Sequence, residues 1–222
     1  MKILIVIDQY DNLSNGTTIN HKIYTYFRSY YNKFRHIHCP SNFIANQLKE
    51  HGYTAKLHVL IEAVKKSKYS DKIQLILGGK GQLYKEYVEL SKNLKNPPIM
   101  KFLTKEELID VLSYTDIYVH SADAEIEAIS CLEAIASGNV PIISNSSESA
   151  TVQFAMDEES LFEHGNSEDL AKKIDYYLDN PKQLEEKRKN YAEFANKFRI
   201  ENSIKLMEEM FKEEIGDYGK EK

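Results

Sequence analysis

Short apolar runs alternate along this chain with longer segments in which apolar residues recur every three or four positions. Continuous apolar runs rich in β-branched residues are typical of buried parallel strands. They predict strands at residues 2–7, 73–77, 99–102, 116–119, 140–144 and 161–162, and a short one at 36–39. Helical periodicity predicts helices at residues 22–36, 42–51, 61–68, 83–94, 106–114, 126–136 and 167–178, and another from near Gln183. This alternation favours an α/β fold built on a doubly wound parallel sheet.

Residues with strong positional preferences mark several of the predicted boundaries. Thr104 is placed to cap the helix at 106–114, which carries acids in its first turn. Pro97 and Pro98 end the helix before them, since proline breaks helices. Asn180 and Pro181 separate the last two predicted helices. The predicted elements therefore have local support beyond their periodicity.

The composition is that of an ordinary globular protein. Of its 222 residues, 42% are hydrophobic and 28% are charged, and the formal net charge of −5 gives no general case for binding nucleic acid. Cys39 and Cys131 are the two cysteines, so we expect a reducing cytoplasm and no disulfide framework. No apolar run reaches the roughly 18 residues of a membrane-spanning helix, so any membrane contact is expected to be peripheral.

The carboxyl ends of the predicted strands carry residues of the kinds that meet ligands. Gly79 and Gly81 follow the strand at 73–77, and glycine lets a backbone approach a ligand closely. Such a turn is consistent with a ligand contact or with a plain tight turn. Ligands of doubly wound sheets lie at the carboxyl ends of the strands. These two glycines and two acids, Glu125 and Glu133, all fall there.

Glu125 and Glu133 lie eight positions apart across the start of the helix predicted at 126–136. Glu125 is expected in the preceding loop, and Glu133 about two turns into the helix, pointing back toward that loop. The helix N-terminus offers free N–H groups and a positive dipole end that suit a phosphate. This arrangement fits a nucleotide sugar, with N–H groups for the diphosphate and carboxylates for sugar hydroxyls. The alternative is a solvated amphipathic helix with two unrelated acids.

The Glu-x7-Glu spacing, with a strand before it and Ser137, Gly138 and another strand after it, resembles the retaining family 4 glycosyltransferases of GT-B fold. The resemblance implies a Rossmann-like sheet equivalent to the C-terminal half of that fold. It also implies that Glu125 contacts the transferred sugar and is the catalytic-site carboxylate, while Glu133 holds the ribose hydroxyls.

The same resemblance assigns further donor-binding residues: the N–H groups of Ala128 and Ile129 for the diphosphate, Gly79 and Gly81 for the nucleotide pocket, and Gly16 and Thr17 for the loop that faces diphosphate and sugar. Taken alone, Gly16 with the preceding Asn15 would simply be a turn. No metal is implied, and the UDP-sugar is a donor substrate with no separate cofactor.

From about residue 61 to residue 211 the chain is similar to bacterial lipid glucosyltransferases, which use UDP-glucose to glucosylate diacylglycerol or sterols. The matching residues are 125–134, 144–146 and 149–155. The implied reaction transfers a hexose to a lipid hydroxyl such as that of diacylglycerol. The hexose is the glucose of UDP-glucose, and its anomeric configuration is retained.

The chain departs from this family in two ways. Residues 1–60 are too few for a full acceptor-side domain, so we expect a truncated N-terminal segment before a nucleotide-sugar-binding domain at residues 61–222. The family's Arg and Lys that neutralise the departing diphosphate have no counterpart, because residues 58–60 run directly into the helix at 61–68. We predict that the strand at 2–7 fills the vacated sheet position beside the strands at 73–77 and 116–119.

The histidines leave alternatives open. His120 ends a predicted strand beside the glutamate motif, which is consistent with a packed or capping histidine or with a contact to the donor. His36 and His38 alternate on one predicted strand, but no Cys, Asp or Glu lies nearby at ligand spacing. We therefore expect no metal site.

Residues 22–35, from Lys22 to Arg35, carry four cations, six aromatic residues and no acid. A helix of this composition suits the surface of an anionic membrane, and equally a core helix with a solvated basic edge. The first interpretation predicts a cytoplasmic protein in peripheral contact with the inner face of the membrane. Apolar surface left where the missing domain would dock predicts self-association.

Three functional hypotheses follow from the sequence. The leading one is a glycosyltransferase that uses a UDP-sugar and a lipid acceptor. The rival is a non-catalytic nucleotide-binding remnant or accessory subunit, which the absent basic loop favours. A sugar-nucleotide epimerase of GT-B type ranks below both, because the similarity to lipid glucosyltransferases is closer.

Overall fold

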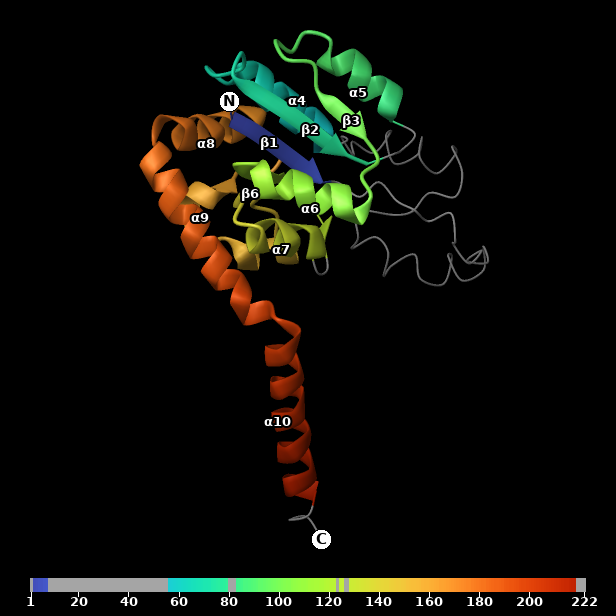
Figure 1. Cartoon of the computed structure of the whole chain (residues 1–222), viewed down its shortest axis with the longest axis vertical. Coiled ribbons are helices and arrows are strands. Elements are labelled where there is room, and N and C mark those ends of the chain that lie inside the picture. The colour runs from blue at the N-terminus through green and yellow to red at the C-terminus, as the bar shows by residue number, and fades with distance from the viewer. Residues whose placement is uncertain (1, 8–55, 80–82, 123, 126–127, 219–222) are drawn as a thin grey trace, which may run out of the picture.

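The computed structural model of the chain describes residues 2–7, 56–79, 83–122, 124–125 and 128–218 (Figure 1). Its centre is a six-stranded parallel sheet in the order β3-β2-β1-β4-β6-β8. The strands are β1 (Lys2–Ile7), β2 (Ile73–Gly78), β3 (Ile99–Lys101), β4 (Ile117–His120), β6 (Val140–Ser144) and β8 (Leu161–Phe162). This order, read along the chain as 3-2-1-4-5-6, is that of a Rossmann sheet. The predicted α/β doubly wound fold is confirmed.

The first strand of the chain lies in the middle of this sheet. All six residues of β1 pair with β2, from Lys2 opposite Ile73 to Ile7 opposite Gly78. On its other side, Leu4 pairs with Ile117 and Ile5 with Tyr118 in β4. The predicted pairing of residues 2–7 with both neighbours is therefore confirmed, and the N-terminal strand is part of the sheet that the later residues build.

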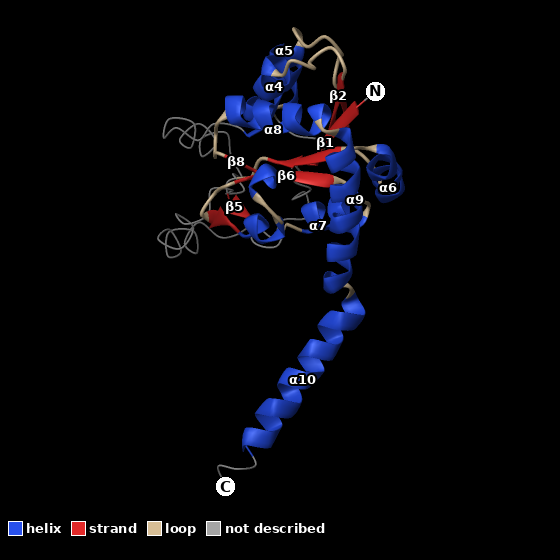
Figure 2. Cartoon of the chain, turned by 90° about the vertical axis from the view of Figure 1, so that its left-hand side faces the viewer, coloured by secondary structure: helices blue, strands red, loops and turns tan. Residues whose placement is uncertain are grey.

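Helices cover both faces of the sheet (Figure 2). One face carries α4 (Lys56–Lys66), α5 (Tyr84–Ser91) and α8 (Ser167–Asp179), and the other carries α6 (Lys105–Tyr114) and α7 (Ile129–Ala136), with α9 (Pro181–Ala195) packed along α7. α4 begins before residue 60, so one helix spans the predicted boundary between the two segments. The division of the chain into residues 1–60 and 61–222 stays a prediction.

The core lies between the sheet and these helices. The strands β2, β4 and β6 are buried on both sides, which explains why they appear in the sequence as unbroken apolar runs. The buried Asn139 joins α6 to α7: its side-chain amide donates to the carbonyl oxygens of Leu112 at 2.8 Å and Ala134 at 3.2 Å. Because a buried amide needs such partners, this residue fixes how α6 and α7 meet β6.

Polar side chains tie the end of α4 to α8. The Lys68 ammonium and the Tyr69 hydroxyl both donate to the Asp179 carboxylate, at 2.6 and 2.7 Å. These bonds, that of Lys68 first, hold the pKa of Asp179 below its usual value. Lys66 forms a further ion pair with Glu168 at 3.2 Å. α4 and α8 are thereby joined across more than a hundred residues of chain.

Two features differ from the sequence prediction near the glutamate motif. The helix predicted at 126–136 begins at Ile129, so Glu133 lies just over one turn into α7. Glu125, expected in a loop, belongs to β5 (Ala124–Glu125), which pairs with β7 (Glu148–Ser149) in a small separate sheet. A two-residue strand is too short to show a periodic pattern. The pairing of β5 with β7 also joins residues more than twenty positions apart, so no local pattern could predict it.

The C-terminal helix α10 (Ile200–Tyr218) extends away from the α/β body (Figures 1 and 2). It follows α9 through the 3-10 turn Asn196–Phe198, where the Phe198 ring packs edge-on against Phe154 and Phe194 at 5.3 Å between centroids. Within the described ranges, no helix is both long and apolar enough to cross a membrane.

Candidate functional site

The carboxyl ends of β2, β1 and β4 meet at one edge of the sheet. The register places Ile7 beside Gly78, Tyr118 beside Ile5, and His120 beside Ile143. The strand order reverses direction between β1 and β4, because the chain builds outward from β1 to one side and then from β4 to the other. Ligands of open α/β sheets bind outside the carboxyl ends of the strands at such a switch point.

The N-terminus of α7 lies after β4 at this edge and has an unusual backbone. Its first flanking residue, Ala128, has φ 52° and ψ 43°, the one left-handed non-glycine residue in the described part of the chain. A residue with a Cβ holds this conformation at a cost of about 1–3 kcal/mol, and such strain gathers at functional sites. The Ala128 carbonyl accepts the first helical bonds, from the Cys131 and Leu132 N–H groups at 2.9 and 3.1 Å.

No described side chain caps the start of α7, and its first turn holds no acid. The N–H groups of a helix's first turn have no partner within the helix, so they are available to an anion unless a side chain takes them. The predicted diphosphate donors Ala128 and Ile129 therefore stand at an uncapped helix N-terminus. Ala128 is buried, whereas the Ile129 side chain is 59% exposed.

Glu133 is the fifth residue of α7 and is half-buried. Cys131, Ala134 and Ile135 on the same helix are fully buried and anchor it to the core. Burial raises the pKa of the Cys131 thiol well above its usual value, which keeps that group neutral and inert. Glu133 is thus carried by a helix whose position is fixed by packing, and helical side chains lean toward the N-terminus of their helix.

A small polar network links the end of β4 to the first turn of α7. The Tyr118 hydroxyl lies 2.9 Å from Nδ1 of His120 and 3.1 Å from Oγ of Ser130. Tyr118 is fully buried and His120 is 5% exposed. The network sets the orientation of the His120 ring, because the Tyr118 side chain is fully buried and its hydroxyl is held in one position. His120 was predicted from the sequence as a candidate contact, whereas Tyr118 and Ser130 were not, because their contact depends on the fold.

Gly79 lies at the end of β2, two strands from β4 and hence about 10 Å away at the usual strand spacing. Its N–H donates to the Lys101 carbonyl at 2.9 Å. At the preceding Gly78, a Cβ would lie 3.0 Å from Leu103 Cδ1, so this stretch of backbone is closely packed. Gly81, Gly16, Thr17 and residues 22–35 lie outside the described residues.

The backbone of Glu125 is held by its pairing in β5 with Ser149 in β7. The buried Ser149 hydroxyl lies 3.0 Å from Thr151 Oγ1 and accepts from the Thr151 N–H at 3.3 Å, which caps the short helix Ala150–Phe154. Residues 149–155 therefore support the strand that carries Glu125. These are among the residues that resemble the lipid glucosyltransferases. Across the described residues, no three His, Cys, Asp or Glu side chains gather as metal ligands would.

Comparisons with known proteins agree with this geometry. The sequence pattern that defines the family described as "Glycosyl transferases group 1" matches residues 41–198. The chain belongs to this family of glycosyltransferases. A comparison with curated protein sequences finds no match.

Solved structures with the same arrangement include the catalytic domain of cholesterol-alpha-glucosyltransferase from Helicobacter pylori. It is 34% identical over 89% of this chain and 99% of that one, with a TM-score of 0.65. TarM (17% identity, TM-score 0.63) and Anabaena HepE in complex with UDP and glucose (12%, 0.59) share the fold. Each match covers 95% of this chain but 35% and 48%, respectively, of those longer chains. The fold therefore matches that of GT-B glycosyltransferases, and this chain spans about half or less of those two.

Proposed function

We propose that this chain binds the UDP-sugar UDP-glucose at the edge of the sheet where β1, β4 and the start of α7 meet. The observation that carries the proposal is the uncapped N-terminus of α7, preceded by a strained Ala128 and followed by Glu133 just over one turn later. A diphosphate satisfies the first-turn N–H groups and the dipole of that helix. The similarity to a cholesterol-alpha-glucosyltransferase and the UDP and glucose bound to HepE support this donor.

Each donor group has a residue assigned to it in this proposal. The N–H groups of Ala128 and Ile129 bind the diphosphate, Glu133 accepts hydrogen bonds from the ribose hydroxyls, and Glu125 contacts the hexose. Gly79, Gly81, Gly16 and Thr17 are assigned to the nucleotide and diphosphate, with His120 as a further contact to the donor. Binding of the departing diphosphate by fixed N–H dipoles is a form of electrostatic catalysis that requires no metal.

The acceptor in this proposal is a lipid hydroxyl, such as that of diacylglycerol, and the sugar is transferred with retained configuration. The basic and aromatic residues 22–35 suit contact with an anionic membrane surface, and in this proposal the protein works at the cytoplasmic face of a membrane. The similarity to a sterol glucosyltransferase supports an acceptor of this class.

A second candidate function is nucleotide binding without turnover, as a remnant or accessory subunit. β1 occupies the first position of the Rossmann order, and residues 8–21 after it contain neither Arg nor Lys. In the resembled family, a cationic loop after the corresponding strand neutralises the leaving diphosphate. α4 is continuous from Lys56 through residues 58–60, so it supplies no such loop either.

Calorimetric titration of the folded chain with UDP and UDP-glucose tests the donor site. We expect binding to weaken about tenfold or more in Glu133→Ala, because a hydrogen bond to a charged group contributes about 1.5–3 kcal/mol. Glu186→Ala, which removes an exposed carboxylate from α9, is the matched control and should bind as the parent chain does. Transfer of labelled glucose to diacylglycerol in vesicles then separates the enzyme from the accessory subunit. A folded chain that ignores both ligands at millimolar concentration would contradict the donor site itself.

A further inference from the structure

The helix α10 exposes a row of large apolar side chains. Ile200, Ile204, Met207 and Phe211 follow one another at spacings of four, three and four residues, which puts them on one face of the helix. They are 69%, 52%, 56% and 54% exposed. In Figures 1 and 2 no other described element runs beside α10. Clustered exposed side chains of this kind mark an interaction surface.

The charge of α10 argues against a membrane as the occupant of this face. Residues 200–218 contain six acids and two lysines, a net charge of −4 from two minus six. Helices that lie on membranes are rich in Lys and Arg, because the cytoplasmic leaflet is negative. The apolar row of α10 is therefore better suited to another protein surface.

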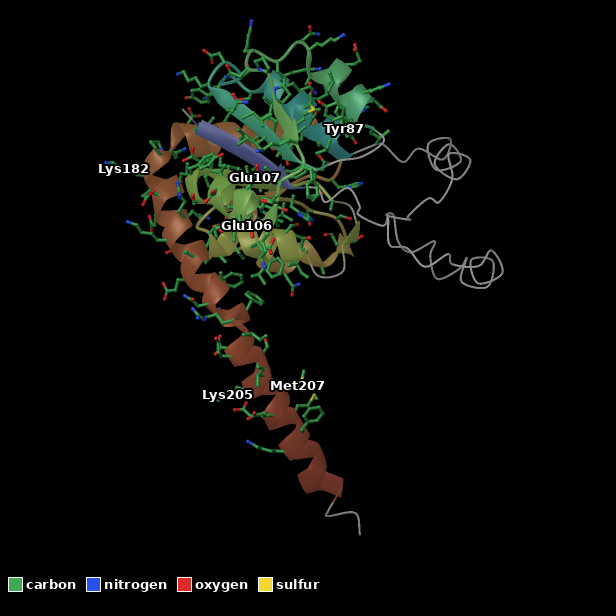
Figure 3. The ribbon with its side chains drawn as sticks, turned by 45° about the vertical axis from the view of Figure 1, so that its right-hand side comes forward. Tyr87, Glu106, Glu107, Lys182, Lys205 and Met207 are labelled. Atoms are coloured by element: carbon green, nitrogen blue, oxygen red, sulfur yellow. The ribbon has the colours of Figure 1, made fainter. Side chains whose placement is uncertain are left out.

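Four charged residues beside the apolar row alternate in sign. Glu201, Lys205, Glu208 and Lys212 also follow spacings of four, three and four residues, so they line one flank of the row. Figure 3 shows Lys205 and Met207 on different sides of the helix. A second α10 laid antiparallel presents this series in reverse order. Glu201 then faces Lys212 of the second copy, and Lys205 faces Glu208 of the second copy, twice over by symmetry.

The apolar row has the same complementarity in a register that differs by two residues, about 3 Å along the helix, which the long Glu and Lys side chains span. In an antiparallel pair, Ile200 lies opposite Phe211 and Ile204 lies opposite Met207, and the two-fold axis repeats both layers. A parallel pair would instead bring identical residues to the same height, which does not place the lysines opposite acids. We propose that α10 is a self-association surface on which α10 of a second copy packs antiparallel. This proposal is independent of the donor site.

The paired surface is small, since a 19-residue helix is about 28 Å long. We therefore expect a weak dimer whose population rises with protein concentration. Sedimentation equilibrium of the full chain, from low to high micromolar concentration, should fit a monomer–dimer equilibrium.

Met207→Glu, which places a charge at the centre of the row, should weaken dimerisation at least about tenfold. Leu206→Glu is the matched control: Leu206 is 66% exposed but off the row, so dimerisation should persist.

Charge reversal tests the antiparallel direction. Lys205→Glu and Glu208→Lys should each weaken the dimer, and the double variant should restore it, because opposite signs again face each other. Far-ultraviolet circular dichroism confirms that each variant keeps its helix. A chain that stays monomeric at every concentration, or a dimer that survives Met207→Glu, would overturn the proposal. The first of these outcomes would assign the face to a different protein.

Discussion

The helices α6 and α7 begin at the same edge of the sheet, but their first turns are completed differently. In α6, Thr104 accepts a hydrogen bond from the Glu107 N–H at 3.2 Å, and the Glu107 carboxylate accepts one from the Thr104 N–H at 3.0 Å. This reciprocal capping box satisfies the end of the helix with the chain's own side chains. In α7, no described side chain caps the start, and Ala128 is held in a left-handed conformation.

The difference separates a structural helix end from one that is suited to a ligand. The acids in the first turn of α6 (Figure 3) complement its dipole and would repel a phosphate. α8 is closed in the same way, because Asn166 accepts from the N–H groups of Glu168 and Asp169 at 2.9 and 3.0 Å. α7 has neither a capping side chain nor an acid in its first turn, although its core-facing residues are fully buried. A helix fixed by its packing, and strained where a cap would be, retains N–H groups for an external anion.

The largest expected effect comes from giving α7 an acid of the kind that α6 has. Ile129→Asp should reduce the affinity for UDP about tenfold or more, because a carboxylate at the helix N-terminus competes with and repels the diphosphate. The fold should be unchanged or stabilised by up to about 1 kcal/mol, since the acid complements the helix dipole and Ile129 is 59% exposed. Calorimetry with UDP and urea unfolding measure the two effects.

Ile129→Asn is the matched control for that substitution. It has nearly the same size and no charge, so it should bind UDP within about threefold of the parent chain. Equal affinity of the Asp variant and the parent would mean that the diphosphate does not bind at this helix, even if UDP binds elsewhere. Loss of binding in both variants would instead indicate that the isoleucine side chain itself contacts the donor.

The contrast between the two helices also explains what the sequence could predict. Thr104 was identified as the cap of α6 because capping is a local pattern of residue types. Strands 2–7, 140–144 and 161–162 were predicted at their observed bounds, since each is a continuous apolar run in the sequence. The start of α7 was placed three residues too early because nothing in an alanine announces a left-handed backbone.

Other errors have the same physical origin in non-local contacts. The pairing of β5 with β7 joins segments more than twenty residues apart, and the Tyr118 contact with Ser130 depends on where β4 meets α7. The helix α10 was not distinguished from α9, because the turn at residues 196–198 contains no proline or glycine. The resemblance supplied Glu125 and Glu133 as site residues, which their spacing alone left open.

A smaller effect is expected at the capped end of α6. Thr104→Ala should lower the free energy of unfolding by about 1 kcal/mol, because it removes the oxygen that accepts from the Glu107 N–H. UDP affinity should not change, since this cap has no role in the donor site. Urea unfolding monitors the loss, and Thr104→Ser, which keeps the hydroxyl, should restore most of it. A parallel loss of UDP affinity would contradict the division of roles between the two helix ends.

The smallest effect concerns the pH dependence of that cap. The Lys101 ammonium donates to the Glu107 carboxylate at 2.9 Å, and this bond, followed by that from the Thr104 N–H, lowers the pKa of Glu107 from its ordinary 4.5. A carboxyl group with a lowered folded-state pKa stabilises the protein above its unfolded pKa, and the contribution is lost as pH falls through the folded value. The Tm difference between the parent chain and Glu107→Gln should therefore shrink as the pH falls below about 4.5. Glu106→Gln, in the same turn but outside the capping box, should show a smaller pH-dependent difference; an equal one would attribute the effect to the helix dipole instead of the cap.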